Sequence, residues 1–223
     1  MPKKTPQTYT QFMHEYMREV KYCLDNLDKK KISQATEYIM QAYNNKRTVF
    51  VMGNGGSAST ASHIACDFGK GTLQRHYDET EPRIKVISLT DNVALMTAFA
   101  NDVSFEDIFF QQLRSLVEPN DVIIAISGSG NSKNVIKAVR YAKKCGAKVI
   151  GLLGFKTGGK LAQMVDCAIN VKSDFYGPCE DIHLIINHMM TSWISKLKSL
   201  HEGKTNVSSE NHAVPFKIID DEK

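Results

Sequence analysis

The sequence predicts an α/β fold in which a parallel sheet is covered by helices on both faces. Three observations favour this class: five short apolar runs, helical stretches between them, and two glycine-rich turns after the first and third runs. Strands that are apolar along their whole length are typical of parallel sheets, because both faces of such a sheet are buried. A chain of 223 residues is long enough for one well-buried domain.

The elements follow from spacing along the chain. Between residues 9 and 45, apolar residues recur at helix spacing in two groups, which predicts an N-terminal helical hairpin. Strands are then predicted at 48–52, 84–89, 122–126, 149–153 and 167–171, with helices at 57–68, 93–100, 105–117, 132–145 and 158–164.

A long final helix is predicted at residues 180–200. Its apolar residues cover so wide an arc that we expect it to pack against several neighbours, another subunit among them, in a homotetramer. The expected organisation is therefore a single domain at residues 7–200, followed by a polar tail at 201–223.

Composition narrows the class of function. A mild net charge of +4, without a basic stripe, argues against a nucleic-acid partner. Five scattered cysteines without a CxxC pair indicate reduced thiols in a cytoplasm. No apolar run reaches the roughly 18 residues of a spanning helix, so we expect no membrane partner.

The first glycine-rich turn, with the sequence GNGGSA, raises the question of which anion it holds. Gly53, Gly55 and Ala58 fit the G-x-G-x-x-G/A pattern of dinucleotide-binding turns, which expose backbone N–H groups at the positive end of a helix. A dinucleotide site also needs an acid about 20 residues later. The first acid after the second predicted strand is Asp91, 38 positions beyond Gly53, so we reject the dinucleotide interpretation.

A serine-rich turn, Ser127-Gly-Ser-Gly-Asn-Ser132, follows the third predicted strand. Three hydroxyls and several free N–H groups at a helix start suit a phosphate group. An ordinary helix cap would need only one serine, so this composition favours a phosphate site.

Together the two turns resemble the sugar isomerase (SIS) domain, and more narrowly its phosphoheptose isomerase branch. The resemblance extends over residues 7–200 and includes the Asn101-Asp102 pair and the ending Glu180-Asp-Ile-His183…His188. It implies a three-layer, flavodoxin-like five-stranded sheet, a homotetramer with shared active sites, and a phosphorylated sugar as substrate. The substrate-binding positions that it implies are Asn54, Gly55, Gly56, Ser57, Asn101, Asp102, Ser127, Gly128, Ser129, Ser132 and Glu180.

The same resemblance implies a metal site, with zinc as the typical ion, at His63, Asp67, Glu180 and His188. His63 and Asp67 are four residues apart and share one face of a helix. Glu180 and His188 are eight apart, about 12 Å along an ideal helix, so both reach one ion only through an irregular helix start or through different subunits. The resemblance also makes Asp67 and His188 the catalytic base and acid. In the alternative interpretation, Asp67 is an ordinary polar residue and His188 a packed histidine.

The chain departs from the family at two of these positions, because the family has Glu at the position of Asp67 and Gln at that of Glu180. The shorter Asp67 changes the reach of the carboxylate, and Glu180 adds a charge that favours a cation and repels an anionic sugar. We expect His183 at a surface or interface, or in place of His188, and Cys66 in the core.

The function that the resemblance implies is isomerisation of sedoheptulose 7-phosphate to D-glycero-D-manno-heptose 7-phosphate in the cytoplasm. The alternative is a non-catalytic sugar-phosphate sensor or a protein-binding SIS adaptor. Two ionisable groups, Asp67 and His188, remain at the catalytic positions, which favours an enzyme.

Overall fold

Five strands form one parallel sheet in the computed structural model, which describes residues 7–205 and the side chains as far as residue 200. The strands are β1 (Thr48–Met52), β2 (Lys85–Ser88), β3 (Val122–Ser127), β4 (Lys148–Leu153) and β5 (Cys167–Asn170). Their order is β2-β1-β3-β4-β5, and every neighbouring pair is parallel. The predicted α/β class is confirmed, and each strand lies within one residue of its predicted bounds.

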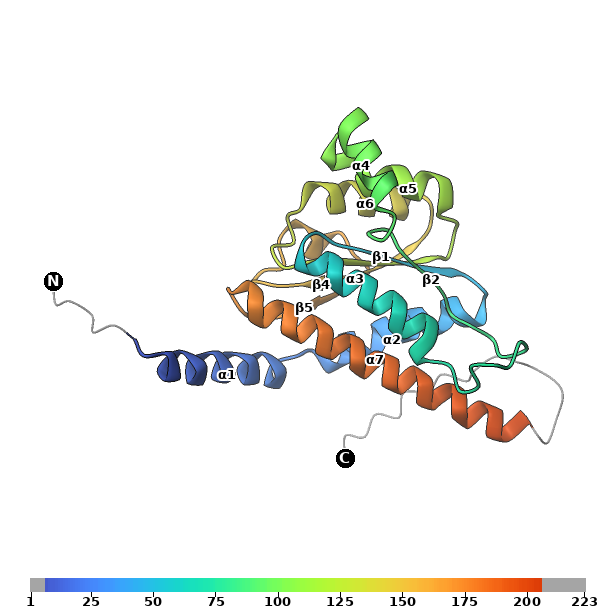
Figure 1. Cartoon of the computed structure of the whole chain (residues 1–223), viewed down its shortest axis with the longest axis horizontal. Coiled ribbons are helices and arrows are strands. Elements are labelled where there is room, and N and C mark those ends of the chain that lie inside the picture. Colours follow the sequence, from blue (N-terminus) through green and yellow to red (C-terminus); the bar gives the residue numbers. More distant parts are fainter. Residues whose placement is uncertain (1–6, 206–223) are drawn as a thin grey trace.

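Helices cover both faces of the sheet, so the fold has three layers (Figure 1). One layer holds α2 (Lys29–Asn44), α3 (Gly56–Cys66) and α7 (Tyr176–Thr205), and the other holds α4 (Val93–Asp102), α5 (Ile108–Leu116) and α6 (Lys133–Lys144). Successive side chains of a strand point to opposite faces of the sheet. Val51 packs in the core under α2, α3 and α7, whereas Phe50 packs in the core under α5 and α6. Both strand faces are therefore buried, as the continuous apolar runs predict.

Short irregular helices complete the connections. A π-helical turn, η1 (Asp67–Gly71), continues α3, and 3-10 turns form η2 (Phe105–Asp107) and η3 (Lys160–Gln163). The predicted helix at 158–164 is thus only a 3-10 turn, which the preceding glycines explain: Gly158 and Gly159 both have positive φ, a conformation that a helix cannot continue.

The final helix is longer than predicted. It begins at Tyr176, four residues before the predicted start, because Pro178 lies in its first turn, where the missing N–H of proline costs no helical bond. It continues to Thr205, into the predicted tail. The remainder of that tail, 206–223, lies outside the described residues.

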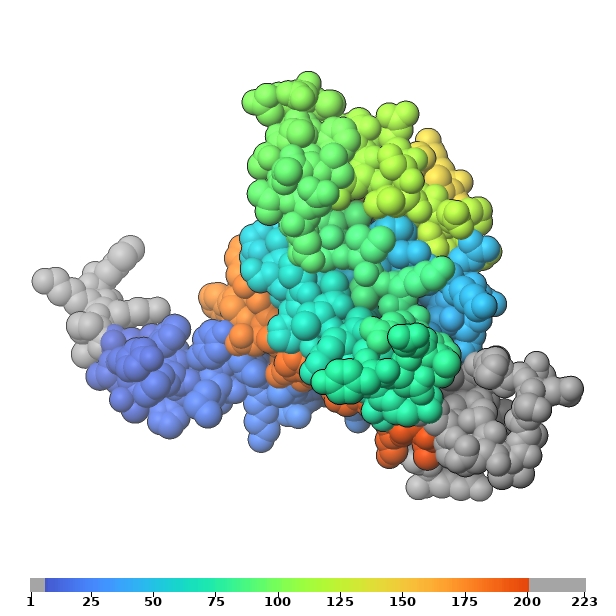
Figure 2. Space-filling view, turned by 45° about the vertical axis from the view of Figure 1, so that its right-hand side comes forward, coloured from blue at the N-terminus to red at the C-terminus, as the bar shows by residue number. Residues whose placement is uncertain are grey.

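The N-terminal helices differ from the predicted hairpin in one respect. Both are present, but α1 (Tyr9–Asp25) projects from the body of the molecule as an arm and does not lie back along α2 (Figures 1 and 2). Its contacts are with the start of α7: Tyr16 donates a hydrogen bond to Asp181 Oδ2 (2.6 Å), and Ser173 donates one to Glu19 Oε1 (2.6 Å). Large apolar side chains on this arm remain exposed as a result.

None of the helices within residues 7–205 combines the length and the hydropathy that a bilayer crossing requires.

Candidate active site and metal centre

The two predicted anion-binding turns lie side by side at the centre of the sheet. They follow the carboxyl ends of β1 and β3, which are adjacent strands in the order β2-β1-β3-β4-β5. The chain leaves β1 towards β2 on one side and returns to β3 on the other, so a topological switch point lies between them. Open α/β sheets bind ligands in the crevice at such a point.

Close packing explains the glycines of the first turn. A Cβ atom at Gly53 would lie 2.7 Å from Ser57 Cβ, and one at Gly56 would lie 2.5 Å from the carboxylate oxygens of Glu180. Gly55 has φ +57°, in the region that favours glycine. Because Gly53 and Gly56 have no side chains, the backbone of the turn can lie directly against Ser57 of α3 and against the Glu180 carboxylate.

A reciprocal amide pair joins this turn to the other one. Asn54 donates to Asn134 Oδ1 (2.9 Å), and Asn134 donates back to Asn54 Oδ1 (2.8 Å). Asn134 is buried in the first turn of α6. The pair fixes the spacing between the two turns.

The serine turn is ordered by its own hydroxyls. Ser127 Oγ accepts a hydrogen bond from the Gly130 N–H (3.1 Å) and lies 3.1 Å from Ser132 Oγ. Ser129 Oγ accepts from the Asn131 N–H (3.2 Å). Ser132 is the N-cap of α6 but its side chain makes no capping bond, so the positive end of that helix is available to an anion.

Three predicted metal ligands meet beside this crevice. His63 lies in the last turn of α3, Asp67 begins the π-helical turn, and His188 lies on α7. The His63 and His188 Nε2 atoms are 3.1 Å apart, and they lie 3.3 and 3.6 Å from Asp67 Oδ2. The three ligand atoms form one compact group, as required for a shared ion.

These separations match the geometry of a zinc site. Four ligands at 2.0–2.1 Å from a tetrahedral zinc lie about 3.3 Å from one another. Two imidazoles facing each other through Nε2 at 3.1 Å also need a proton or a cation between them, since two lone pairs would repel. Both imidazoles are about half exposed, so one side of the group is open to a substrate. The residues present therefore fit zinc.

Glu180 stands apart from this group. It lies in the first turns of α7, two helical turns before His188, and its carboxylate packs against Gly56 at the start of α3. The structure therefore brings together three of the four predicted ligands, and it places the fourth against the first glycine-rich turn.

Two other sequence predictions are wrong. His183 is neither at a surface nor a substitute for His188: it is 1% exposed, and its Nε2 lies 3.0 Å from the Leu153 carbonyl oxygen. Burial lowers the pKa of this imidazole to about 4. Cys66 is exposed and does not belong to the core, because the helix turns its next residue, Asp67, towards α7.

The remaining predicted sugar contacts lie on α4, near the end of β2. Asn101 and Asp102 are exposed in the last turn of α4, where Asn101 donates to Asp102 Oδ1 (2.8 Å). Asp91, which follows β2, accepts hydrogen bonds from the hydroxyls of Ser62 and Ser88. Ser62 precedes His63, so Asp91 is tied directly to the helix that carries the metal group.

One functional residue, Asn187, is absent from the sequence predictions. It is fully buried on α7 and donates a hydrogen bond of 2.6 Å to Asp67 Oδ2. Its sequence signal is an amide between Ile186 and His188, on a buried helix face that it shares with His183 and Thr191.

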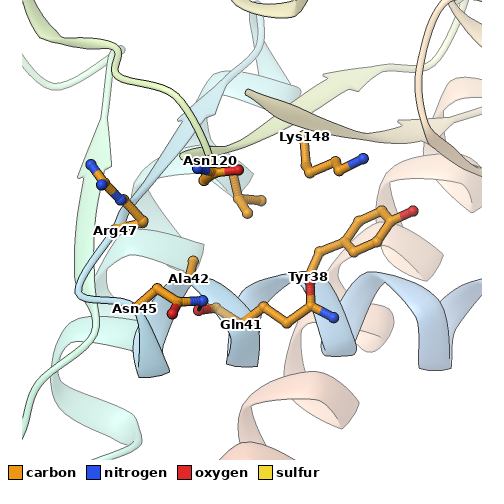
Figure 3. A pocket seen from close by; sticks show the side chains of 8 residues that line it. Tyr38, Gln41, Ala42, Asn45, Arg47, Asn120 and Lys148 are labelled. Carbon is orange, nitrogen blue, oxygen red and sulfur yellow. Dashed lines mark hydrogen bonds between the residues drawn. The ribbon is translucent and has the colours of Figure 1, made fainter. Parts of the chain in front are cut away.

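A separate cavity of about 390 Å³ lies at the amino ends of β1, β3 and β4, away from the crevice at their carboxyl ends (Figure 3). Its lining includes Arg47 and Lys148, together with Tyr38 and amide side chains of α2. Arg47 is already paired with Glu118 at 2.8 Å, and the Lys148 ammonium lies 5.9 Å from the centre of the Tyr38 ring. This cavity contains none of the predicted site residues.

Comparisons with known proteins agree with this geometry. Residues 12–154 match the family model of the SIS domain. The chain is 34% identical over 182 residues to a probable phosphoheptose isomerase of Thermoplasma acidophilum, covering 82% of this chain and 97% of that protein. It is 37% identical over 167 residues to a phosphoheptose isomerase of Geotalea daltonii, covering 74% and 83%. Among solved structures, phosphoheptose isomerase GmhA from Neisseria gonorrhoeae superposes with a TM-score of 0.75 at 30% identity, over 84% of this chain and 96% of that chain.

Proposed function

The chain belongs to the SIS domain family and, within it, to the phosphoheptose isomerases; from this premise we propose that it converts sedoheptulose 7-phosphate to D-glycero-D-manno-heptose 7-phosphate. The proposal rests on one observation: the same crevice contains a serine turn at a helix N-terminus and, beside it, a carboxylate with two imidazoles. A phosphorylated sugar needs an anion site and a proton-transfer site at once.

The phosphate group is assigned to the serine turn. Ser127, Ser129 and Ser132 surround the uncapped start of α6, and Asn54 to Ser57 line the facing turn through α3. The backbone N–H groups at the starts of α3 and α6 form the positive ends of these helices and would donate to a bound anion. Asn101 and Asp102 are assigned to the sugar hydroxyls, with Glu180 between the two regions.

The isomerisation moves a proton between C1 and C2 of the sugar and another between their oxygens. We assign these transfers to Asp67 and His188, one as base at the carbon and the other as acid at the oxygen. Asp67 Oδ2 and His188 Nε2 are 3.6 Å apart, and each side chain is partly open to solvent. A substrate that lies beside the pair can contact both groups through an adjacent carbon and oxygen.

His63, Asp67 and His188 would hold one divalent cation, and their nitrogen-rich donor set favours zinc. Glu180, the fourth predicted ligand, would reach this cation only if its carboxylate left Gly56. When bound, the cation would polarise the sugar oxygens. The residues themselves orient the substrate and move the protons.

We further propose a cytoplasmic homotetramer in which neighbouring subunits complete the site. Exposed apolar side chains gather on α1, where Phe12 is 50% and Met17 is 67% exposed. On α7 a hollow of about 510 Å³ borders His188, and its lining includes Met189 and Trp193. A second subunit that covers this hollow would bury the open side of the metal group.

Turnover of sedoheptulose 7-phosphate tests the proposal. The purified enzyme should form the aldose product, detected by NMR, and a chelator should abolish turnover that added zinc restores. Asp67→Asn and His188→Ala should each abolish turnover and leave calorimetric binding of the sugar phosphate within a few-fold. An enzyme that binds sugar phosphates but isomerises none, with or without zinc, would instead be a sensor or adaptor.

A further inference from the structure

We propose that Asn187 is a positioning residue of the active site, whose side-chain amide holds the Asp67 carboxylate in register with the two imidazoles. The inference rests on the proposed function, because it concerns the same metal group. It assigns a function to a residue that contacts neither turn nor substrate.

The amide has one defined orientation. Asn187 Nδ2 donates to Asp67 Oδ2 at 2.6 Å, and Asn187 Oδ1 accepts from the Thr191 hydroxyl at 3.4 Å. Asn187 is 0% exposed, and Thr191 is 9% exposed one turn further along α7. The chain Thr191–Asn187–Asp67 therefore runs from the protein interior to the partly exposed carboxylate of the site.

The oxygen held by Asn187 is the one that faces both imidazoles. Asp67 Oδ2 lies 3.3 Å from His63 Nε2 and 3.6 Å from His188 Nε2. A carboxylate can rotate about its last bond and exchange its two oxygens. A charge-assisted hydrogen bond to one oxygen, from a donor fixed in a helix, removes that freedom.

Packing alone does not require an amide here. Ile186 and Met190, which lie beside it in the core, are apolar, and leucine has the same number and branching of side-chain heavy atoms as asparagine with no polar group to satisfy. A buried amide stays in a core where it has a partner, and the charged partner of Asn187 is Asp67. Groups that orient metal ligands in this way generally set metal affinity.

The test compares Asn187→Leu with Thr36→Val. Thr36 is also buried (4% exposed) and its hydroxyl bonds only to the Ile32 carbonyl of α2, so its loss removes a buried hydrogen bond away from the site. Asn187→Leu should weaken zinc binding about 10- to 100-fold, measured by chelator competition, and lower kcat with little change in KM. Thr36→Val should change neither.

A double-mutant cycle separates positioning from a general structural effect. In an Asp67→Ala background, Asn187→Leu should weaken zinc binding no further, because the carboxylate that it positions is absent. An equal loss in both backgrounds, or unchanged zinc affinity in Asn187→Leu, overturns the proposal.

A metal-free crystal structure of Asn187→Leu gives a reading that does not depend on the reaction. The Asp67 carboxylate should turn away from the imidazoles, and a carboxylate that stays in place overturns the proposal. If the wild type isomerises no sugar phosphate, the proposed function fails, while this structure still decides what Asn187 does.

Discussion

At the residue scale, the serine turn gives the most direct prediction about binding. Ser127→Ala and Ser129→Ala each remove one hydroxyl from the predicted phosphate site, and each also loosens the turn, since both hydroxyls accept backbone bonds within it. A lost hydrogen bond to a charged group weakens binding by about 1.5–3 kcal/mol, roughly 10- to 150-fold per serine. Calorimetry with sedoheptulose 7-phosphate measures it, and unchanged affinity in the double variant would move the phosphate elsewhere.

His183 gives a prediction about pH. Burial holds its pKa at about 4 in the folded protein, below the ordinary 6.5 of an unfolded chain. As the pH falls from 6.5 to 4, the unfolded chain binds a proton that the folded chain does not, so the free energy of unfolding decreases over that window, by about 3 kcal/mol. His183→Gln, which keeps an N–H for the Leu153 carbonyl, should flatten this decrease.

Urea unfolding at pH 7, 5.5 and 4, at fixed protein concentration, measures the effect. His14→Gln, which removes an exposed imidazole from α1, is the matched control and should leave the slope as it is. A slope that is the same in His183→Gln and in the wild type would contradict the assignment.

Individual residues also show where prediction from sequence stops. His63 and Asp67 are found together because their spacing of four on one helix is a local property. His188 joins them through the resemblance to the family and not through spacing. Asn187 could not be predicted, because the partner of a buried amide depends on which helix packs against it, and α3 lies 120 residues away in sequence.

At the element scale, a buried ion pair ties a long loop to the final helix. Lys198 of α7 donates to Glu81 Oε1 (3.1 Å) and to the Thr72 carbonyl (3.0 Å), and Glu81 accepts the N–H groups of Gln74 and Arg75. Lys198 and Glu81 are 2% and 3% exposed. Removing one partner of such a pair leaves an uncompensated buried charge, which costs about 3–5 kcal/mol.

Lys198→Met should therefore lower the free energy of unfolding by about that amount, measured in urea. The double variant Lys198→Met with Glu81→Gln should recover part of the loss, because the buried charge is gone. Lys196→Met, which removes an exposed lysine two residues earlier, should cost under about 1 kcal/mol. A similar small effect for Lys198→Met would show that the pair contributes little.

Strands are the elements that the sequence predicts best. The three central strands, β1, β3 and β4, are buried along nearly their whole length and are almost continuous apolar runs, and this pattern needs no knowledge of neighbours. The π-helical turn at Asp67–Gly71 and the early start of α7 were missed for a different reason. Neither follows from apolar periodicity: α3 widens where it packs against α7, and the first turn of α7 includes Pro178, which loses no helical hydrogen bond there.

At the scale of the whole molecule, the projecting arm gives a prediction about assembly. A chain of 25.0 kDa should sediment as a tetramer of about 100 kDa, because α1 and α7 expose more apolar surface than a monomer usually does. Met17→Glu and Trp193→Glu should each dissociate it in analytical ultracentrifugation. Tyr77→Ser, which alters a fully exposed aromatic side chain on the loop before β2, should leave the assembly unchanged. A stable wild-type monomer at micromolar concentration would contradict the proposed assembly.

The reciprocal amide pair between the two turns also fixes when, during folding, the crevice can form. Asn54 and Asn134 are 80 positions apart, and they meet only after β1 and β3 have paired in register. Contacts between such distant positions require closure of a large loop, which places them late on the folding route. The crevice therefore forms no earlier than the pairing of β1 with β3, so a chain in which these two strands have not yet met has no catalytic competence.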